Sequence, residues 1–185
     1  MRQLKMLRPS APVVHHDLPA GMHYEFYKGT DAEIADWLAL NDGAILPDSD
    51  PHWFRDIIVN YPDLVPAEDL FFVVTEDGRR VATSASVTHA NGAGYIHMVA
   101  CAPEYRGRGI GRAMLSYSLE ILERRGCPYS YLTTDDFRLA AIKTYLDAGF
   151  LPVLRPDPEA DAKTRWEAVL RNLRYREVGY ITEDA

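Results

Sequence analysis

The stretch MVACAPEYRGRGIGRAML, residues 98–115, changes its pattern twice over a short distance. It begins as an apolar run typical of a buried strand, which breaks at Pro103, and it ends with apolar residues at the spacing of an amphipathic helix. Between the two lies a turn rich in arginine and glycine. The stretch therefore predicts a strand, a glycine-rich turn and a helix in immediate succession.

The turn has the chemistry of an anion site. Its glycines leave bare backbone next to the first turn of the helix, where the N–H groups have no partners within the helix. The helix dipole and the arginine side chains favour negative charge at the same place, so we expect the turn to bind phosphate. The residues concerned are Arg106, Gly107, Arg108, Gly109, Gly111 and Arg112.

Two familiar phosphate loops do not fit this turn. A Walker A loop needs a lysine followed by serine or threonine, and the stretch contains none of these residues. A dinucleotide-binding loop needs a third glycine at the position of Arg112. The pattern that does fit is R-x-x-G-x-G, formed by Arg106, Gly109 and Gly111.

A second motif lies on the next predicted helix, in AAIKTYLDAGF at residues 140–150. Its pattern A-I-x-x-Y-x-x-x-G-F, taken with R-x-x-G-x-G, resembles the GNAT superfamily of N-acetyltransferases over residues 22–153. The resemblance implies an α/β (α+β) fold with a mixed, mostly antiparallel sheet, a splayed central strand pair and flanking helices. It also implies acetyl-coenzyme A as cosubstrate.

In that family the turn and the helix start hold the pyrophosphate of acetyl-coenzyme A, and the preceding strand pairs its backbone with the pantetheine arm. One position departs from the family, because Arg138 stands where the second motif commonly has asparagine. This longer side chain either contacts a cofactor phosphate or lies in solvent. The residues expected to bind the cofactor are Val99, Cys101, Arg106, Gly107, Arg108, Gly109, Ile110, Gly111, Arg112 and Arg138.

Acetyl transfer to an amine needs a base, a donor for the carbonyl oxygen and a proton for the leaving thiolate. His97 is the first candidate base, because the two-residue period of a strand places it on one face with Val99 and Cys101. A similarity to the arylalkylamine acetyltransferases points to the same residue, whereas a histidine satisfied in the core is the alternative. Glu104 is a second candidate base. The resemblance assigns backbone N–H groups near Val99 to the oxygen and Tyr145 to the thiolate, although Tyr145 also fits a packing role.

The acceptor side is marked by charge. Residues 41–70 contain seven acidic residues against one arginine, a net charge of −6. In the family the first two helices and their loop form the acceptor wall, so we expect a small cationic amine there; an ordinary solvated surface is the alternative. The residues expected to contact the acceptor are Trp37, His52, Trp53 and Phe54.

The remaining periodicity predicts strands and helices in alternation. Strands are expected over 22–29, three times within 70–102, and over 129–134 and 150–154. Helices are expected over 31–43, 51–62, 109–126, 135–150 and 163–173, with Phe137 on the apolar stripe of the fourth. Since no linker or repeat divides the chain, we expect residues 1–185 to form a single GNAT-like acyltransferase domain.

Composition excludes several classes of function. The net charge of −7 opposes a general nucleic-acid partner. Cys101 and Cys127 are the only cysteines, so neither a disulfide framework nor a thiolate metal site is expected, and the histidines lack metal-ligand spacing. The first residues lack an apolar core of signal-peptide length, and no stretch approaches the ~20 apolar residues of a membrane span. We therefore expect a cytoplasmic protein without a metal or a membrane partner.

The combined expectation is an acetyl-coenzyme A-dependent N-acetyltransferase that transfers the acetyl group directly within a ternary complex. A coenzyme A-binding sensor or regulatory module without turnover is one alternative, supported by Arg138. A protein acetyltransferase acting on lysine or an N-terminus is the other, and an open groove would indicate it. Dimers are common in this family, so a homodimer stays open, as does the role of residues 174–185.

Overall fold

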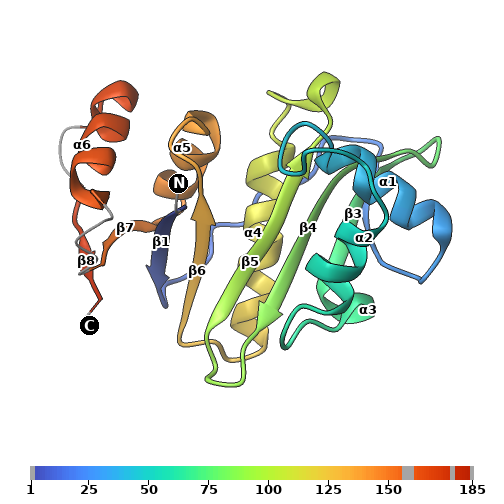
Figure 1. The fold of residues 1–185 in the computed structure, drawn as a ribbon, viewed down its shortest axis with the longest axis horizontal. Coiled ribbons are helices and arrows are strands. Elements are labelled where there is room, and N and C mark those ends of the chain that lie inside the picture. The colour runs from blue at the N-terminus through green and yellow to red at the C-terminus, as the bar shows by residue number, and fades with distance from the viewer. Residues whose placement is uncertain (1–2, 156–160, 176–177, 184–185) are drawn as a thin grey trace.

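The computed structural model describes residues 3–155, 161–175 and 178–183. Within these ranges one sheet runs in the order β2-β3-β4-β5-β6-β1-β7-β8 (Figure 1). The β5/β6 and β7/β8 pairs are parallel, and the other neighbouring pairs are antiparallel. The strands are β1 (Leu4–Pro9), β2 (Met22–Phe26), β3 (Leu70–Thr75), β4 (Arg80–Thr88), β5 (Gly94–Cys101), β6 (Tyr129–Thr134), β7 (Leu151–Leu154) and β8 (Ile181–Thr182).

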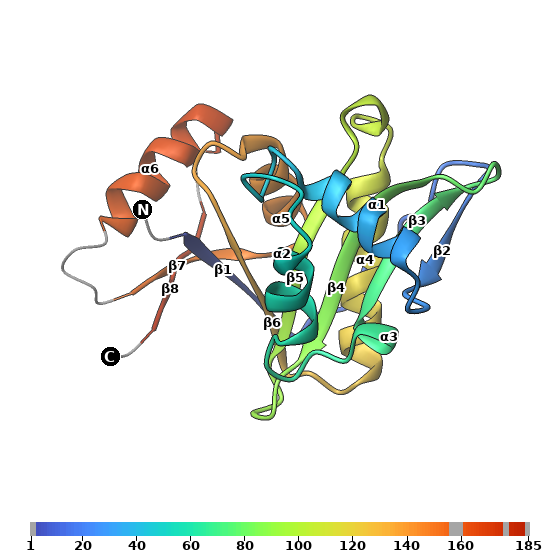
Figure 2. The same ribbon diagram turned by 45° about the vertical axis from the view of Figure 1, so that its right-hand side comes forward.

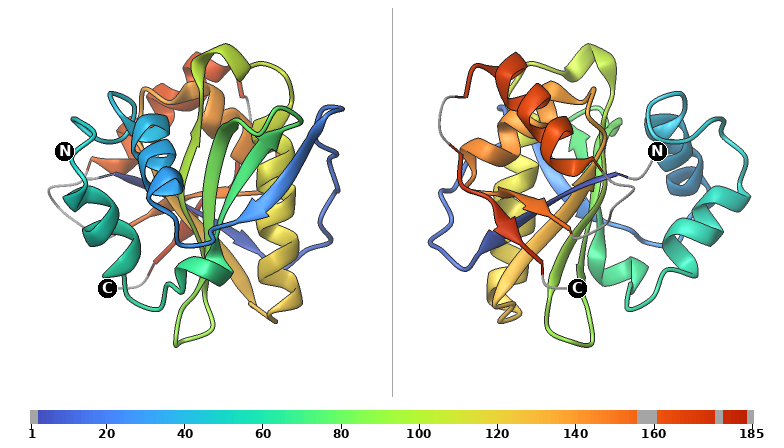
Figure 3. Two further views of the ribbon diagram at one scale, coloured as in Figure 1. Left: turned by 90° about the vertical axis from the view of Figure 1, so that its right-hand side faces the viewer. Right: turned by 60° about the vertical axis from the view of Figure 1, so that its left-hand side comes forward.

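Helices cover both faces of this sheet. The described ones are α1 (Asp31–Asn41), α2 (His52–Phe54), the π-helical turn η1 (Arg55–Val59), α3 (Pro66–Asp69), the 3-10 turn η2 (Pro103–Tyr105), α4 (Ile110–Arg124), α5 (Leu139–Asp147) and α6 (Ala162–Leu173). Figure 2 shows α1 and α2 in front of β4 and β5, with α4 behind, and Figure 3 shows α4, α5 and α6 together on one side. The expected mixed, mostly antiparallel fold is confirmed.

The first strand was not predicted. β1 lies between β6 and β7 and is antiparallel to both, so the start of the chain is built into the sheet (Figure 1). Leu4 and Met6 face the core with 2% and 0% exposure, in alternation with partly exposed Lys5. Arg8 is also buried, and its Nε donates to the Ala148 carbonyl at 2.8 Å. A run this short that contains two charged residues gives only a weak strand signal.

The two central strands separate part way along their length. β5 and β6 pair only at Gly94 with Ser130 and at Tyr95 with Tyr131. A side chain at Gly94 would put its Cβ 2.8 Å from Leu122 of α4, so glycine lets the helix pack closely where the strands meet. Beyond that point the strands share no pairs, and they open toward the end of the sheet where the arginine–glycine turn begins.

A β-bulge lies in β5 just above the separation. The register of β4 and β5 passes from Ala85–His97 to Thr83–Ala100, so two residues, Met98 and Val99, stand opposite one. Met98 has a φ of 52°, which is rare for a residue other than glycine. The bulge reverses the alternation, and the predicted common face of His97, Val99 and Cys101 is therefore wrong: His97 faces α1 and η1, whereas Val99 and Cys101 face α4.

The end of the chain adds an edge to the sheet. Ile181 pairs with Val153 in parallel, so β8 extends the sheet beyond β7. The sequence alone left the role of residues 174–185 open, and residues 176–177 and 184–185 lie outside the described ranges. Across the described part of the chain, no helix is both long and apolar enough to cross a bilayer.

Candidate active site

A groove of about 820 Å³ lies where β5 ends and α4 begins. The start of α5 and the loop Gly43–Ile45 after α1 complete its walls. The structure brings most of the predicted cofactor residues together here, because all of them except Arg108 line the groove. The lining members are Val99, Cys101, Arg106, Gly107, Gly109, Ile110, Gly111, Arg112 and Arg138.

The turn presents its backbone to the groove. Gly107 and Gly109 have φ values of 75° and 88°, a region that favours glycine, and Gly109 is the N-cap of α4. No side chain caps the helix, so its first N–H groups are left for another partner. A Cβ built at Gly107, Gly109 or Gly111 meets nothing within 4 Å. The space above the helix start is therefore open to a ligand.

The arginines of the turn have different positions. Arg106 donates from Nε to the Cys101 carbonyl at 3.0 Å, which ties the turn to the end of β5. Arg112 is only loosely paired, with Nη2 3.5 Å from Asp147. Arg108 donates to the Glu104 carbonyl at 2.9 Å and does not line the groove. Arg106 and Arg112 are thus the two cations of the turn placed for an anion in the groove.

Arg138 closes the groove from the opposite side. Its Nε donates to Asp135 at 2.9 Å, and its Nη2 donates to the carbonyl of Ala44 in the loop after α1. The guanidinium therefore joins the two walls that face each other across the groove. Phe137, placed on the apolar stripe of a helix by the sequence, is 75% exposed because α5 begins only at Leu139.

Tyr145 projects from α5 into the groove and is 8% exposed. Burial raises the pKa of its phenol to about 12, and the nearby Tyr95 adds to the rise. The phenol is consequently neutral and carries its proton at physiological pH. It can donate that proton to a base that forms in the groove.

His97 lies on the other face of β5 and does not line the groove. It is 9% exposed, with Nδ1 3.2 Å from the Tyr95 hydroxyl and Nε2 3.3 Å from the Ile57 carbonyl. Because a carbonyl only accepts, Nε2 carries the proton and Nδ1 accepts from Tyr95. Burial lowers the pKa of His97 to about 4 and keeps the imidazole neutral.

Tyr95 is a functional candidate that sequence reasoning missed. Its hydroxyl contacts His97 and also lies 3.4 Å from Thr133 Oγ1 on β6, across the point where the strands separate. The Tyr61 hydroxyl is a further hydrogen-bond partner. The available signal was its position two residues before His97 on the same face of a strand.

The bulge supplies backbone donors beside this tyrosine. Met98 and Val99 share one partner position on β4, so one residue of the pair is outside the ladder. β6 has already separated from β5 on the other side. The backbone near Val99, assigned to the carbonyl oxygen by resemblance, is therefore released from sheet pairing at the inner end of the groove.

The predicted acceptor contacts are not gathered in the groove. Trp37 and Phe54 are 0% and 2% exposed, and their rings pack 5.2 Å apart in the core, which leaves no surface for an acceptor. His52 pairs with Asp50, and neither it nor Trp53 lines the groove. Glu104, the second candidate base, is 58% exposed and pairs with an arginine at the surface.

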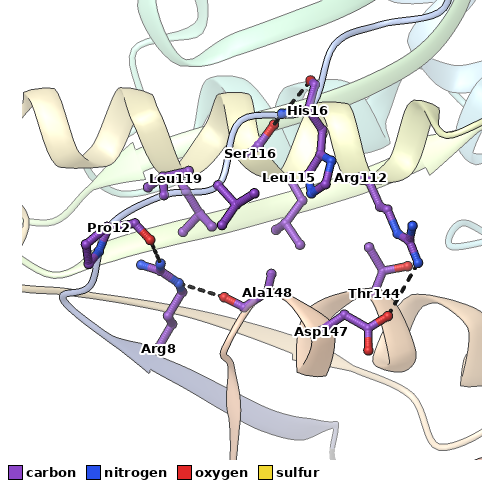
Figure 4. Close-up of a pocket in the computed structure, with 12 residues that line it drawn as sticks. Arg8, Pro12, His16, Arg112, Leu115, Ser116, Leu119, Thr144, Asp147 and Ala148 are labelled. Carbon is purple, nitrogen blue, oxygen red and sulfur yellow. Dashed lines mark hydrogen bonds and ion pairs between the residues drawn. The ribbon is translucent and has the colours of Figure 1, made fainter.

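A second cavity of about 260 Å³ lies behind the groove, between α4, α5 and the segment after β1. It shares Arg112 and Thr144 with the groove. Figure 4 shows Arg8 at its far end, where the guanidinium donates to the carbonyls of Pro12 and Ala148. The segment after β1 is thus fixed over the two helices that carry the cofactor motifs. In the described ranges, no group of three or more His, Cys, Asp or Glu side chains is arranged to hold a metal ion.

Comparison with known proteins gives a family match over more than half of the chain. The model of the acetyltransferase (GNAT) family matches residues 23–150. The mycothiol acetyltransferase of Beutenbergia cavernae is 29% identical over 140 residues, which are 74% of this chain and 47% of that protein. The mycothiol acetyltransferase of Thermobispora bispora is 31% identical over 158 residues, 79% of this chain and 52% of that protein. The chain spans about half the length of these curated relatives.

A solved structure shares the fold. The GCN5-related N-acetyltransferase from Sphaerobacter thermophilus superimposes with a TM-score of 0.66 and 24% sequence identity. The match covers 82% of this chain and 49% of that one. The similarity supports the arrangement of sheet and helices around the groove.

Proposed function

The chain belongs to the acetyltransferase (GNAT) family, and we propose that it transfers an acetyl group from acetyl-coenzyme A directly to a primary amine. The observation that carries this proposal is the groove itself. An uncapped helix start, two arginines and open glycine backbone lie at one end, and the Tyr145 phenol lies at the other. A sensor module without turnover needs the first feature but not the second.

The groove fits a pyrophosphate joined to an extended arm. The N–H groups of residues 107–111, with Arg106 and Arg112, would hold the phosphates. The exposed edge of β5 beyond its pairing with β6 would hold the amide groups of the arm. When bound, acetyl-coenzyme A supplies an activated acetyl group whose sulfur leaves as a thiolate.

The residues at the inner end would act on charge and protons. The backbone near Val99 would donate to the carbonyl oxygen as negative charge develops there. Tyr145 would give its proton to the thiolate. His97 would act as base through the Tyr95 hydroxyl, which gives its proton to Nδ1 as it takes one from the amine.

We keep a small amine as the acceptor. The acidic composition of residues 41–70 overstates the negative charge that is available to attract a cationic amine. Much of that acidity is engaged within the chain, since Asp69 is 4% exposed and pairs with Arg125, and Asp63 pairs with His89. Because the relatives are mycothiol acetyltransferases, their acceptor is a second candidate. We also keep the proposal that residues 1–185 act as one domain in the cytoplasm.

The test is thiol release from acetyl-coenzyme A in the presence of a panel of amines. The panel holds cationic, neutral and acidic amines, a lysine peptide, a peptide with a free N-terminus and the acceptor of mycothiol acetyltransferases. We expect turnover with at least one small amine, and its loss in Tyr145→Phe. Binding of acetyl-coenzyme A without turnover on any amine would favour the sensor, and turnover on the peptides alone would favour a protein acetyltransferase.

A further inference from the structure

Five aromatic side chains form one stack on the side of β5 that faces α1 and η1. Tyr95 and His97 come from β5, Tyr131 from β6, and Tyr61 and His89 from the loops after η1 and β4. Ring centroids of Tyr95 and Tyr131 lie 4.6 Å apart, and those of Tyr61 and His97 lie 4.4 Å apart. His89 lies 5.9 Å from Tyr131, with nearly parallel rings. Segments far apart in the sequence thus bring three phenols and two imidazoles together.

The outer end of the stack is a hydrogen-bonded triad. His89 Nε2 lies 2.8 Å from the Tyr131 hydroxyl, and His89 Nδ1 lies 2.9 Å from Asp63 Oδ2. Since a carboxylate only accepts, Nδ1 carries the proton, and Nε2 is free to accept from Tyr131. The carboxylate thereby selects the tautomer that can receive a proton from the phenol, as an aspartate does for a catalytic histidine.

Asp63 makes this contact from an unfavourable backbone conformation. Its φ of 64° is rare for a residue with a side chain, although aspartate tolerates this region better than most. The carboxylate also accepts from the Ala90 N–H at 3.3 Å, which fixes it against the turn that carries His89. Strained backbone of this kind persists where the surrounding contacts require it and is frequent at functional sites.

Burial decreases along the stack. Tyr95 and His97 are 8% and 9% exposed, whereas the side chains of His89 and Asp63 are 17% and 36% exposed. A proton that reaches the buried end has no direct route to water, but one that reaches His89 does. Exposure therefore rises from the residues at the separation of β5 and β6 to His89 and Asp63 at the surface.

We propose that His89, held by Asp63, is the outlet through which the proton removed from the acceptor amine leaves the buried Tyr95–His97 pair, an inference that rests on the proposed function. The transfer makes and breaks only O–H and N–H bonds. Tyr131 gives its proton to His89 Nε2 as its oxygen receives one from the hydroxyl of Tyr95, whose ring stacks on that of Tyr131. The imidazolium beside Asp63 then releases a proton to water, and every phenol regains its starting state.

The charges around the stack favour this direction. Charge on His89 adds to burial in lowering the pKa of His97, so the two imidazoles do not hold protons together. From β1, Lys5 lies over the Tyr131 ring at 4.7 Å and pairs with Glu183, which also pairs with Arg155. The other groups facing His89 are the phenols of the stack and Asp63, whose carboxylate accepts from Nδ1.

The test compares His89→Ala and Asp63→Asn with the matched control His23→Ala, an exposed histidine that pairs with Glu25 on β2. With the best amine from the panel, we expect His89→Ala to lower kcat about 10²-fold while KM for acetyl-coenzyme A stays within about twofold. Added imidazole should restore the rate, more so as pH rises and more imidazole is neutral. Asp63→Asn should keep the fold and also lower kcat, because the carboxylate no longer fixes the tautomer of His89 that accepts from Tyr131.

Two results would overturn the outlet. One is an unchanged kcat in His89→Ala. The other is a loss of kcat in His89→Ala that added imidazole does not restore and that Asp63→Asn does not share. Thermal unfolding of each variant separates loss of fold from loss of transfer. If the intact protein acetylates no amine, both the proposed function and the role of His89 are wrong. If the intact protein turns over and His89→Ala and Asp63→Asn keep its kcat, only the role of His89 is wrong.

Discussion

The two faces of β5 are built for different tasks. On the side of α4 the strand borders the groove, with glycine backbone, arginine side chains and an uncapped helix start. On the side of α1 and η1 it carries a buried stack of phenols and imidazoles whose hydrogen bonds are filled by the protein itself. The bulge at Met98 and Val99 assigns residues to these faces. One face is thus suited to binding an anion and the other to moving protons.

The largest effect should follow from reversing a charge on the binding face. Arg106→Glu removes a cation from the groove, adds an anion and breaks the bond to the Cys101 carbonyl. We expect affinity for acetyl-coenzyme A to fall about 10³-fold, or about 4 kcal/mol, measured by calorimetry. Arg108→Glu is the matched reversal outside the groove, with an expected loss below about tenfold. Equal losses in the two variants would mean that overall charge, and not this site, attracts the cofactor.

On the opposite face, His97 should make stability depend on pH. Its pKa is about 4 in the folded protein against a reference of 6.5, so the unfolded chain binds more protons between these values. The free energy of unfolding therefore falls as pH drops from about 6.5 to 4, by about 3 kcal/mol from this residue. His97→Gln should remove that part of the loss, as judged by denaturant unfolding at a series of pH values. The same slope in both proteins would contradict a buried neutral imidazole.

Tyr145 lines the inner end of the groove. Tyr145→Phe keeps the ring packed near Phe150 and removes only the hydroxyl. We expect kcat to fall about 10²-fold with an unchanged KM for acetyl-coenzyme A, because the proton for the thiolate is lost. Steady-state kinetics measures both quantities. A rise in KM with an unchanged kcat would place the hydroxyl in binding.

The smallest effect should come from His52. It pairs with Asp50 at the surface and does not line the groove, so His52→Ala should leave the KM for the amine within about twofold. Ile45→Ala, which enlarges the groove wall, should change the same KM by about tenfold. A large effect of His52→Ala alone would move the acceptor site from the groove toward α2.

The binding face was predictable because its signal is local. The arginine–glycine turn, the helix after it and Tyr145 lie in two short motifs whose spacing is visible in the sequence, and the family and the fold class followed from them. The other face was not predictable, because its members meet only through strand pairing. The bulge at Met98 adds one residue to a strand and sends His97 to the side opposite the groove, which no two-residue period can show.

Two further features could not be predicted from local sequence, because they depend on contacts between distant parts of the chain. β1 is stabilised by two neighbours that lie more than a hundred residues away in the sequence, so its short Leu4–Pro9 run carries little signal of its own. Trp37 and Phe54 were assigned to the acceptor by their aromatic character, yet they pack against each other under α1 and α2. Aromatic residues beside an expected site are equally suited to the core that supports it.

The most direct test of the binding face is a calorimetric titration with acetyl-coenzyme A of the intact protein, Gly111→Leu and the distant control Gly179→Leu. At Gly111 a side chain has free space and ordinary backbone geometry, and leucine favours helix, so the fold should be kept while the position above the helix start is filled. The account predicts micromolar binding by the intact protein and the control, and none detectable in Gly111→Leu at an unchanged Tm. Equal binding by all three proteins, or none by the intact protein, would contradict it.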